Sequence, residues 1–500
     1  MLLIFKKYAK KYAKKGLGIY KDLKKIKTSS LKSTFDQKPI KLVGFVKCFN
    51  EGKTGNLERC LKHLSKFCDD IVFCDDSSSD NSIEIAKKYT KNIIVMPDEF
   101  KKELYHKQKL LELALSLNPD WIVSLDPDEI FDREGELGGI RKLCHYGNKH
   151  NIDSFSFLYH NLWKDTKNFR TDELWLKNWQ PKLWKNTGKL KFDVKDGLHL
   201  RQYPLGLKMD RRTDIKIIHY GFGTEESVNR KYSNYQSLGQ TGWSLERIKD
   251  EKTLVLKPFS RDWFPPSTMN ISVICLIYKS IGYADFVLNS FKKYTKFDID
   301  VDFYFIANDP ADKLLNHFDE NNIKYKLFRN KDPEEYYLNR VYRAWNFGGF
   351  DANSDVVVFI NSDMAFSKDW LNNLLKNLRE DRIVTCRLIE SGKLRSGKYG
   401  IGKNFGKTYS EFNDESFQKY VKEISTSQIK EGGLFMPCAI YTDLFVKSGG
   451  YPIGNRTEKN GNITPGDKIL FYEKLSSMGI KHYTVFDSLV YHIQEGEMDS

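Results

Sequence analysis

Residues 121–132 read WIVSLDPDEIFD, a strand-like apolar run that leads directly into carboxylates at Asp126, Asp128 and Glu129. In open parallel sheets, ligands bind outside the carboxyl ends of the strands, so acidic residues at that place indicate a ligand site. Two carboxylates two positions apart on an extended segment can direct hard oxygen atoms at one divalent cation. An ordinary acidic turn with an Asx hydrogen bond is the alternative interpretation.

Strand-like and helix-like segments alternate on the N-terminal side of this stretch. Short apolar runs predict buried strands, and apolar residues spaced three and four apart predict helices. Strands that alternate with helices are typical of a parallel α/β sheet. The predicted strands are 41–46, the start of 71–82, and 92–96, and the predicted helices are 56–67 and 104–117.

The same plan starts again near residue 271, where apolar strands again lead into acidic loops, as in VDFYFIANDPAD and DVVVFINSDMAF. The repeat is about 230 residues long, which indicates tandem domains and not a solenoid. The proline pair in KPFSRDWFPPSTMN (257–270) cannot continue a helix or a central strand and predicts a joint. We expect a basic amphipathic N-terminal segment at 1–40, which carries no strand pattern, a domain at 41–245, a linker at 246–270 and a second domain at 271–500.

The composition is that of a globular protein with an excess of positive charge. Apolar residues make up 40% of the 500 residues and aromatic residues 14%, which suits two or three packed domains. The net charge of +14 favours anionic partners such as nucleotides, phospholipid headgroups or nucleic acid. The eight cysteines form no CxxC pair, which predicts reduced core cysteines of a cytosolic protein and neither a zinc site nor a disulfide framework.

The N-terminal 20 residues are rich in lysine. On a helix, MLLIFKKYAKKYAKKGLG has one apolar face and one lysine face, which suits an anionic membrane surface. A solvated basic tail is the alternative interpretation. No apolar run reaches the ~18–20 residues of a membrane span. We expect a cytoplasmic protein that lies peripherally on the inner face of a membrane if the helix forms, and no nucleic-acid partner, because no such binding motif appears.

Three stretches carry a resemblance to a known family: FNE (49–51), FCDDSSSDNS (73–82) and LDPDEIF (125–131). On these, residues 41–245 resemble a family 2 glycosyltransferase with the GT-A fold and a DxDE-type acidic motif. Residues 271–500 resemble a second, more divergent GT-A domain. The stretches for the second domain are FINSDMAFS (359–367), GGLFMPCAIYTDLFVKSGGYP (432–452), GDKILFYEKL (466–475) and VYHIQEGE (490–497).

The resemblance implies an α/β protein of two tandem GT-A domains, which are Rossmann-like nucleotide-diphospho-sugar transferase folds. It also implies roles for residues of the first domain. Asn50 and Glu51 would line the nucleotide pocket, and Asp76 would hold the base or ribose of the donor. Asp126 and Asp128 would bind Mg²⁺ or Mn²⁺ and the donor diphosphate. The neighbouring acidic residue, Glu129, would support them or face the acceptor.

In the second domain, the resemblance places Asn308 and Asp309 at the positions of the DD pair in FCDDSSSDNS, which is Asp75 and Asp76. It places Asp363 on the metal side of the donor. The second domain departs from the family pattern, because NSD (361–363) has Asn361 in place of the first carboxylate of DxD. Metal affinity there would be weaker, or a further ligand is needed. This departure favours an alternative in which only one domain is catalytic and the other binds donor or acceptor.

Two histidines, His219 and His492, each follow a short apolar strand near the end of their repeat. In GT-A enzymes a late histidine can complete the metal site, and neutral imidazole suits Mn²⁺. A core histidine with one satisfied nitrogen is the alternative interpretation of each.

An inverting transferase needs a base that takes a proton from the acceptor hydroxyl. In the second domain, GDKILFYEKL resembles the acidic helix start that carries this base, so we expect Asp467 to be catalytic. A helix N-cap is the alternative role of that residue. In the first domain, RTDELW (170–175) offers Asp172 and Glu173 as candidates, with a solvated loop as the alternative.

An aromatic insert at 158–184 holds four of the nine tryptophans. Aromatic faces stack on sugar C–H surfaces, so an acceptor platform is one interpretation, and a hydrophobic core or domain interface is another.

Taken together, the sequence predicts a bifunctional, inverting, metal-dependent glycosyltransferase. It would move sugars from nucleotide-sugar donors to a glycan, lipid-linked or protein acceptor. Besides the version with one degenerate domain, a nucleotidyltransferase is an alternative, because that class also uses paired carboxylates and Mg²⁺.

Overall fold

The computed structural model of the chain describes most of its residues. The described ranges are 20–31, 39–97, 102–172, 175–194, 201–237, 243–250, 252–295, 300–332, 335–392, 397–433, 436–452, 456–457, 463–464, 466–494 and 496. The amphipathic helix predicted at 1–20 lies outside them, apart from Tyr20. Within the described ranges, no helix has the length and apolar character needed to cross a membrane.

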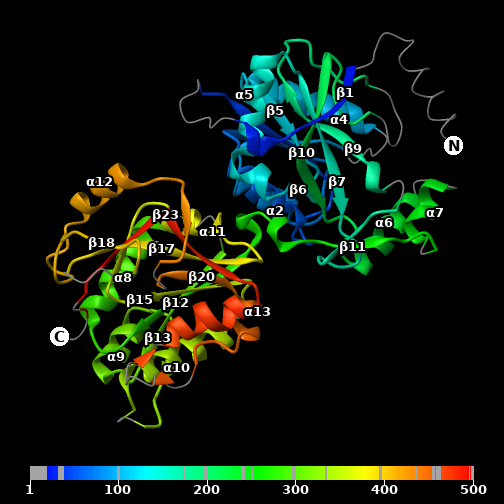
Figure 1. Cartoon of the computed structure of the whole chain (residues 1–500). Helices are drawn as coiled ribbons and strands as arrows, with labels where there is room; N and C mark the ends of the chain where they lie inside the picture. Colours follow the sequence, from blue (N-terminus) through cyan, green and yellow to red (C-terminus); the bar gives the residue numbers. More distant parts are fainter. Residues whose placement is uncertain are drawn as a thin grey trace. The chain divides into compact units, whose positions relative to one another are not determined.

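The chain divides into two compact units, Met1–Pro265 (unit 1) and Pro266–Ser500 (unit 2). Figure 1 shows each unit as a twisted sheet with helices packed against it. Each sheet mixes parallel and antiparallel strands.

In unit 1 the strand order is β4-β3-β2-β5-β9-β7-β10-β1, with β6 paired to β10. The strands are β1 (Tyr20–Ile26), β2 (Leu42–Cys48), β3 (Asp70–Asp75), β4 (Asn92–Val95), β5 (Trp121–Ser124), β6 (Glu129–Phe131), β7 (Ser154–Asn161), β9 (Trp179–Lys185) and β10 (Met209–His219). A separate small sheet pairs β8 (Asn168–Arg170) with β11 (Leu256–Pro258). The helices are α2 (Asn56–Leu64), α3 (Ser82–Lys87), α4 (Glu103–Ser116), α5 (Ile140–His150), α6 (Glu225–Ser237) and α7 (Trp243–Lys249).

The sequence predicted a parallel sheet and no strand before residue 41. The parallel arrangement is confirmed for β4, β3, β2 and β5, but β9 runs antiparallel to both of its neighbours. The expectation of a strandless N-terminal segment was wrong, because β1 pairs with the edge of β10. An edge strand tolerates lysine, since one side of it faces solvent, so YKDLKKI gives no apolar signal.

In unit 2 the strand order is β14-β13-β12-β15-β20-β17-β23-β16, with β18 beside β17 and β19 beside β23. The strands are β12 (Asn270–Ile277), β13 (Asp300–Asn308), β14 (Tyr325–Phe328), β15 (Val356–Asn361), β16 (Met364–Phe366), β17 (Arg382–Glu390), β18 (Ile401–Gly402), β19 (Ile429–Glu431), β20 (Cys438–Tyr441) and β23 (Lys481–His492). The helices include α8 (Ile281–Tyr294), α9 (Asp312–Glu320), α10 (Tyr337–Phe350), α11 (Trp370–Leu375), α12 (Asp414–Ile424), α13 (Thr442–Lys447) and the short α14 (Gly466–Lys468).

The two sheets share one plan. Seven strands follow in the same order from β4 to β10 and from β14 to β23, so that β2, β5, β9 and β7 match β12, β15, β20 and β17, and an eighth strand, β6 or β16, pairs with the last of the seven. The sense of every pairing also agrees, including the antiparallel turn-back of β6 onto β10 and of β16 onto β23. Strand β1 occurs in unit 1 alone among the described parts of the two sheets.

The alternation of apolar residues explains how the helices of unit 1 cover both faces of the sheet. Leu42 and Val46 of β2 face a core formed with α2, α3 and α5. Val43 and Phe45 face the opposite core, which is formed with α4. Successive strand residues point to opposite faces, so a fully apolar strand such as β2 is covered on both sides.

His160 in β7 gives unit 1 an acid-sensitive core. Its ring is stacked on Phe169 with centroids 4.3 Å apart, and burial together with Lys216 and Lys25 lowers the pKa of His160 to about 3. In the unfolded chain a histidine has a pKa of about 6.5. Protonation therefore favours the unfolded state, so the stabilisation is complete above about pH 6.5 and is lost as the pH falls toward 3.

We expect His160→Phe to remove this sensitivity while keeping the stacked ring. At pH 5 the wild type should lose about 2 kcal/mol of unfolding free energy through His160 relative to pH 8, and the variant should not. Calorimetric melts of both proteins at the two pH values measure the difference. An equal loss in both would show that His160 is not the acid-sensitive group.

Candidate active sites

In unit 1, the acidic stretch forms the turn between β5 and β6. The Glu129 amide donates to the Asp126 carbonyl at 3.0 Å, and the Asp126 amide donates to the Glu129 carboxylate at 3.0 Å. Strand β6 then pairs antiparallel with β10 and places His219 opposite Glu129. As a result, His219 Nε2 lies 3.2 Å from Asp128 Oδ2. The predicted pairing of an acidic strand end with a late histidine is present in space.

A buried lysine, Lys182, offsets the repulsion between the neighbouring carboxylates Asp126 and Glu129. Lys182 on β9 lies 2.7 Å from Glu129 Oε2 and 3.2 Å from Asp126 Oδ2, and Tyr159 donates to Glu129 Oε1 at 2.6 Å. Burial alone would lower the pKa of Lys182, but the two carboxylates outweigh it and hold that pKa well above its usual value. Burial likewise opposes ionisation of Asp126, yet Lys182 and Lys107 keep the pKa of Asp126 below its usual range. Lys182 and Asp126 are therefore both charged.

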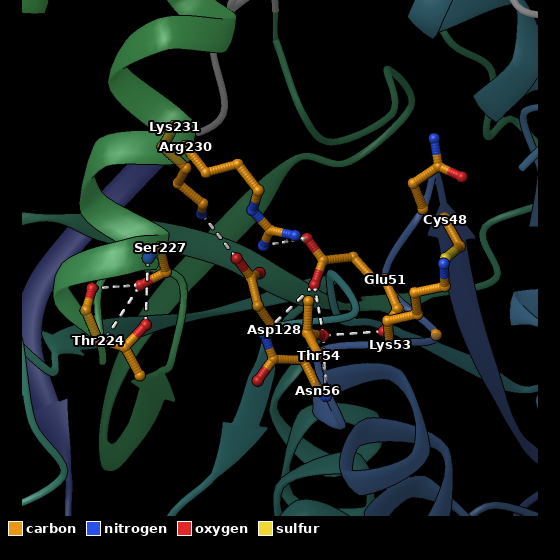
Figure 2. A network of polar contacts seen from close by, with 12 residues as sticks. Cys48, Glu51, Lys53, Thr54, Asn56, Asp128, Thr224, Ser227, Arg230 and Lys231 are labelled. Carbon is orange, nitrogen blue, oxygen red and sulfur yellow. Dashed lines mark hydrogen bonds and ion pairs between the residues drawn. The ribbon is translucent and has the colours of Figure 1, made fainter. Parts of the chain in front are cut away.

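A second lysine reaches the same carboxylates from α6. Figure 2 shows Lys231 directed at Asp128 and Arg230 directed at Glu51. The Lys231 ammonium lies 2.7 Å from Asp128 Oδ2, and the Arg230 guanidinium lies 3.1 Å from Glu51 Oε1. Burial raises the pKa of Asp128, but Lys231 and His219 overcome this and hold it well below its usual value.

The tautomer of His219 follows from its other neighbour. Asn161 at the end of β7 accepts a hydrogen bond from His219 Nδ1 at 2.7 Å. An amide oxygen only accepts, so Nδ1 carries a proton, and the other ring nitrogen, Nε2, is the one that faces Asp128 and Lys231. A histidine held in this way is ready to act as a ligand.

The other predicted donor-binding residues of unit 1 lie around this site. Asn50 has left-handed backbone geometry (φ 52°) and accepts from the Ser79 amide at 2.8 Å. It lines a cavity of about 580 Å³ together with Asp80, Arg59 and Arg230. Glu51, which is partly exposed, also accepts from Thr54 at 2.8 Å. These contacts join the end of β2 to α6.

Asp76 is less open than the sequence suggested. Its carboxylate bonds to Lys47, and His106 Nδ1 lies 3.0 Å from its other oxygen. The side chain is 3% exposed, and both of its oxygens contact protein groups.

The candidate base of unit 1 has a strong partner. Arg170 holds Asp172 with two parallel hydrogen bonds of 2.6 and 3.0 Å. The guanidinium itself is buried between the rings of Trp163 and Trp175, at 4.4 and 4.9 Å from their centroids. Asp172 thus completes an ion pair within an aromatic cluster. The second candidate, Glu173, lies outside the described residues.

The tryptophan-rich insert mostly forms core. Trp163, Trp175 and Trp184 are buried, and Trp163 and Trp175 pack with Phe222 and Val228 in one apolar cluster. The core interpretation of the insert holds for these three side chains. Trp179 is partly exposed and stacks beneath Arg212 at 4.7 Å.

Unit 2 builds its site on the same strand pairings. His492 of β23 lies opposite Met364 of β16, the residue after Asp363, just as His219 lies opposite the residue after Asp128. His492 Nε2 is 3.4 Å from Asp363 Oδ2, and its Nδ1 donates to Glu390 at 3.0 Å. Burial lowers the pKa of His492, but the two carboxylates outweigh it and raise the pKa to about 10.

Glu390 takes the place of Asn161. Each residue ends a strand that pairs in parallel with the histidine strand, and each lies directly opposite the histidine. The side chain of Glu390 is fully buried. A carboxylate behind the ring is the common arrangement for a histidine that binds a metal.

A cavity of about 730 Å³ in unit 2 unites four predicted residues, Asn308, Asn361, Asp363 and Asp467. Its walls come from the ends of β12, β13 and β15 and from α10. Several buried polar atoms around it have no protein partner: Asp363 Oδ1, Arg340 Nε and Trp345 Nε1. Unpartnered buried groups are costly, so their convergence on one cavity indicates a ligand site.

Asp467 lies in the first turn of α14 and lines this cavity. The Lys468 amide donates to Asp467 Oδ1 at 2.8 Å. Burial raises the pKa of Asp467 above its usual value, which makes the carboxylate a stronger base.

The strand ladders correct one residue alignment. If Asp128 is matched to Asp363, the pairings of β2 with β3 and of β12 with β13 place Asn308 at the position of Asp76, and Asp309 at that of Ser77. Ser77 and Asp309 also share left-handed geometry, with φ of 56° and 49°. Asn308 and Asp309 therefore stand one position later than the DD pair. Asp309 lies 3.8 Å from Arg340, beside the cavity.

The same strand pairings show that three neighbouring charged residues of unit 1 have neutral residues at the equivalent positions of unit 2. Asp126 corresponds to Asn361, and Glu129 corresponds to Met364. Lys182, which pairs with both in unit 1, corresponds to Cys438. A positive partner and two carboxylates in unit 1 are thus replaced by three neutral side chains in unit 2.

The donor atoms suit a divalent cation. Each unit offers one carboxylate and one imidazole that face each other, and they form a ligand pair for a divalent cation once the facing ring nitrogen carries no proton. The pair is incomplete as it stands, since no group of three or more His, Cys, Asp or Glu side chains within the described ranges is arranged to hold a metal. In unit 1, Asp126 is the nearby carboxylate that could join Asp128 and His219 after leaving Lys182.

Lys182, Arg230, Lys231, Tyr159 and Glu390 were not among the residues expected from the sequence. The lysine within the aromatic strand WQPKLW is the one signal that could have indicated a buried charge.

Comparison with known proteins identifies part of unit 1. Residues 45–202 match the family model Glycosyl transferase family 2. No curated protein sequence matches the chain. Among solved structures, GalNAc-T7 with UDP, GalNAc and Mn²⁺ is 15% identical and matches over 45% of this chain and 44% of its own, with a TM-score of 0.31.

Two further solved structures are similar at the same level. The mannosyltransferase PcManGT from Pyrobaculum calidifontis, in complex with GDP-Man and Mn²⁺, is 14% identical over 54% of this chain and 65% of its own, with a TM-score of 0.30. TarS 1–349 of S. aureus is 15% identical over 45% of this chain and 61% of its own, with a TM-score of 0.32. The chain thus spans less than two thirds of each of these solved chains.

Proposed function

We propose that the chain is a glycosyltransferase that uses nucleotide-sugar donors and that it is bifunctional, starting from the match of residues 45–202 to the family model Glycosyl transferase family 2. Each unit takes a nucleotide sugar, and the two add successive sugars to one acceptor. The acceptor is a glycan, a lipid-linked saccharide or a protein. Both units have the GT-A fold in this proposal.

The observation that carries the proposal is the repetition of one site in both units. Seven strands follow in the same order and sense, and an eighth pairs with the last of the seven. Asp128 and His219 in unit 1 match Asp363 and His492 in unit 2, and each histidine is oriented by the residue opposite it in the neighbouring strand. The family match supports the GT-A fold for unit 1, and the shared plan extends it to unit 2.

The donor of unit 2 would occupy the 730 Å³ cavity at the strand ends. The aromatic wall of Tyr337, Tyr342 and Trp345 suits a nucleobase, and Arg340 suits a phosphate or a carbonyl. Asp363 lines the edge of this cavity that is nearest to His492, and the donor diphosphate would bind at that edge. In unit 1 the equivalent edge is formed by Asp126 and Asp128.

We include Mn²⁺ or Mg²⁺ as the cofactor on the chemistry of the ligand pairs. Asp128 with His219, and Asp363 with His492, are the residues that would hold it, and Asp126 would complete the set in unit 1. A bound divalent cation would neutralise the diphosphate of the leaving nucleotide.

In unit 2, Asp467 is the base of an inverting transfer. Its carboxylate takes the proton of the acceptor hydroxyl as that oxygen bonds to the anomeric carbon. The bond from the anomeric carbon to the diphosphate oxygen breaks on the opposite face, and nucleoside diphosphate leaves. The raised pKa of Asp467 matches this role, because a stronger base accepts the proton more readily.

One observation bears on the alternative that unit 2 is degenerate. Unit 2 lacks the first DxD carboxylate, but it also lacks the lysine that balances this carboxylate in unit 1. The loss is therefore compensated, and Asp363, His492, Glu390 and Asp467 are all in place. This pattern favours an altered donor site over a decayed one.

A donor screen tests the proposal. Wild type and Asp363→Asn are incubated with UDP-, GDP- and dTDP-sugars and with monosaccharide, lipid-linked or peptide acceptors. Nucleoside-diphosphate release and incorporation of labelled sugar are both measured. We expect two donors, one of which is lost in the variant. Incorporation from one donor that Asp363→Asn leaves intact would make unit 2 a binding domain, and consumption of nucleoside triphosphate without sugar transfer would indicate a nucleotidyltransferase.

A further inference from the structure

The Lys231 ammonium lies where the proposed divalent cation of unit 1 would bind. It lies 2.7 Å from Asp128 Oδ2 and 3.4 Å from His219 Nε2, so it donates toward both atoms of the ligand pair in unit 1. The hydrogen bond from His219 Nδ1 to Asn161 turns Nε2 toward this point. A positive charge beside a carboxylate and an imidazole nitrogen is the environment that a divalent ion would have there.

Gly221 shows how closely these three groups converge. A Cβ atom at Gly221 would lie 2.0 Å from Lys231 Nζ, 2.4 Å from Asp128 Oδ2 and 2.6 Å from His219 Nε2. No side chain can stand at residue 221 without displacing all three groups. The backbone thus leaves a space that the ammonium fills.

The helix that carries Lys231 is held by a narrow apolar face and by charged links. Of the 13 residues of α6, Val228 is buried, and the partly buried Tyr232 and Tyr235 pack against the same apolar cluster. The start of the helix is closed by a reciprocal pair, in which Thr224 and Ser227 bond each other's amides at 3.0 and 3.1 Å (Figure 2). Arg230 and Lys231 are the ion-pair links from α6 to Glu51 and Asp128. A helix with one fully buried side chain can shift when its charged links are broken.

We propose that Lys231 is a tethered cation that competes with the divalent ion for Asp128 and His219. In the protein without donor, the ammonium satisfies the ligand pair and holds α6 against the strand ends. Binding of a divalent ion requires the ammonium to leave, and this release frees the C-terminal part of α6. The inference rests on the proposed metal-dependent donor site of unit 1 and adds the residue that regulates its occupation.

The competition predicts that removing the ammonium strengthens metal binding. Asp363→Asn is used as the background in all proteins, so that unit 2 does not contribute. In this background, Lys231→Met should bind Mn²⁺ about tenfold more tightly than the parent, which is equivalent to about 1.4 kcal/mol. Free Mn²⁺ is followed by electron paramagnetic resonance during titration, without donor or acceptor.

Two further variants serve as controls. Lys231→Arg keeps a positive charge on α6 and should bind Mn²⁺ as weakly as the parent. Lys109→Met removes an exposed lysine of α4 that pairs with Glu112 and should leave the affinity unchanged. Circular dichroism checks that each variant is folded.

Hydrogen exchange provides a second readout. Mn²⁺ should increase amide exchange in residues 231–237 of the parent, while Lys231→Met should show the faster exchange without Mn²⁺. Equal or weaker Mn²⁺ binding by Lys231→Met would overturn the inference, as would the absence of Mn²⁺ binding in both proteins. No sugar transfer is measured in these experiments. Competition by Lys231 can therefore be shown even if the proposed transferase reaction fails, and it can be ruled out even if that reaction is found.

Discussion

Asp128→Asn should lower sugar transfer from the unit 1 donor by about a thousandfold. The amide keeps the shape of the side chain, but it removes the negative charge that faces His219 and Lys231 at 3.2 and 2.7 Å. Removing one preorganised electrostatic group from an active site costs about 10²–10³ in rate. Loss of the bound cation would add to this effect.

The control for this experiment is contained in the same molecule. Transfer from the unit 2 donor should stay within about twofold of wild type, because Asp128 lies in a different unit. Initial rates for each donor are measured separately with saturating acceptor. Equal loss of both activities would mean that the two sites act as one, and an unchanged unit 1 rate would remove Asp128 from the site.

Asp467→Asn should lower the turnover of unit 2 by about a thousandfold while leaving the KM for its donor nearly unchanged. General-base catalysis contributes about 10²–10⁴ to rate. Asn keeps the oxygen that accepts from the Lys468 amide at 2.8 Å, so the start of α14 should be preserved. The change therefore removes proton transfer and keeps the local structure.

The pH profile separates a base from a merely structural carboxylate. Since burial raises the pKa of Asp467, wild-type kcat/KM should fall as the pH drops through a value above the ordinary range of aspartate. The variant should lack this acidic limb. Asp443→Asn, an exposed aspartate in the first turn of α13, is the matched control and should behave as wild type. A raised donor KM with normal turnover in Asp467→Asn would assign this residue to donor binding instead.

The sequence was sufficient to place the acidic strand ends and the two histidines. Apolar runs that end in carboxylates are local patterns, and the ends of parallel strands necessarily meet at one edge of a sheet. Asp128 with His219, and Asp363 with His492, are adjacent for this reason. The roles of these residues in the reaction stay predictions until the variants are measured.

The cations of the site could not be predicted in this way. Lys182 reaches Asp126 and Glu129 only because β9 runs antiparallel between β5 and β7, a pairing that depends on distant residues. Lys231 depends on the fold of α6 back over the strand ends. Asp76 looked like an open ligand because the two side chains that contact its carboxylate, Lys47 and His106, come from a neighbouring strand and from a helix.

The exchange of Asp126, Glu129 and Lys182 for Asn361, Met364 and Cys438 has an evolutionary consequence. Lys182 and Glu129 are buried, and removing one partner of a buried ion pair costs about 3–5 kcal/mol. An ancestor that changed one of these positions at a time would have passed through proteins with an unbalanced interior charge. If the units arose by duplication, one copy could lose activity through these intermediate sequences while the other copy stayed active. A single-domain ancestor had no second copy to keep the activity. The same reasoning advises anyone who grafts one site onto the other unit to transfer all three residues together.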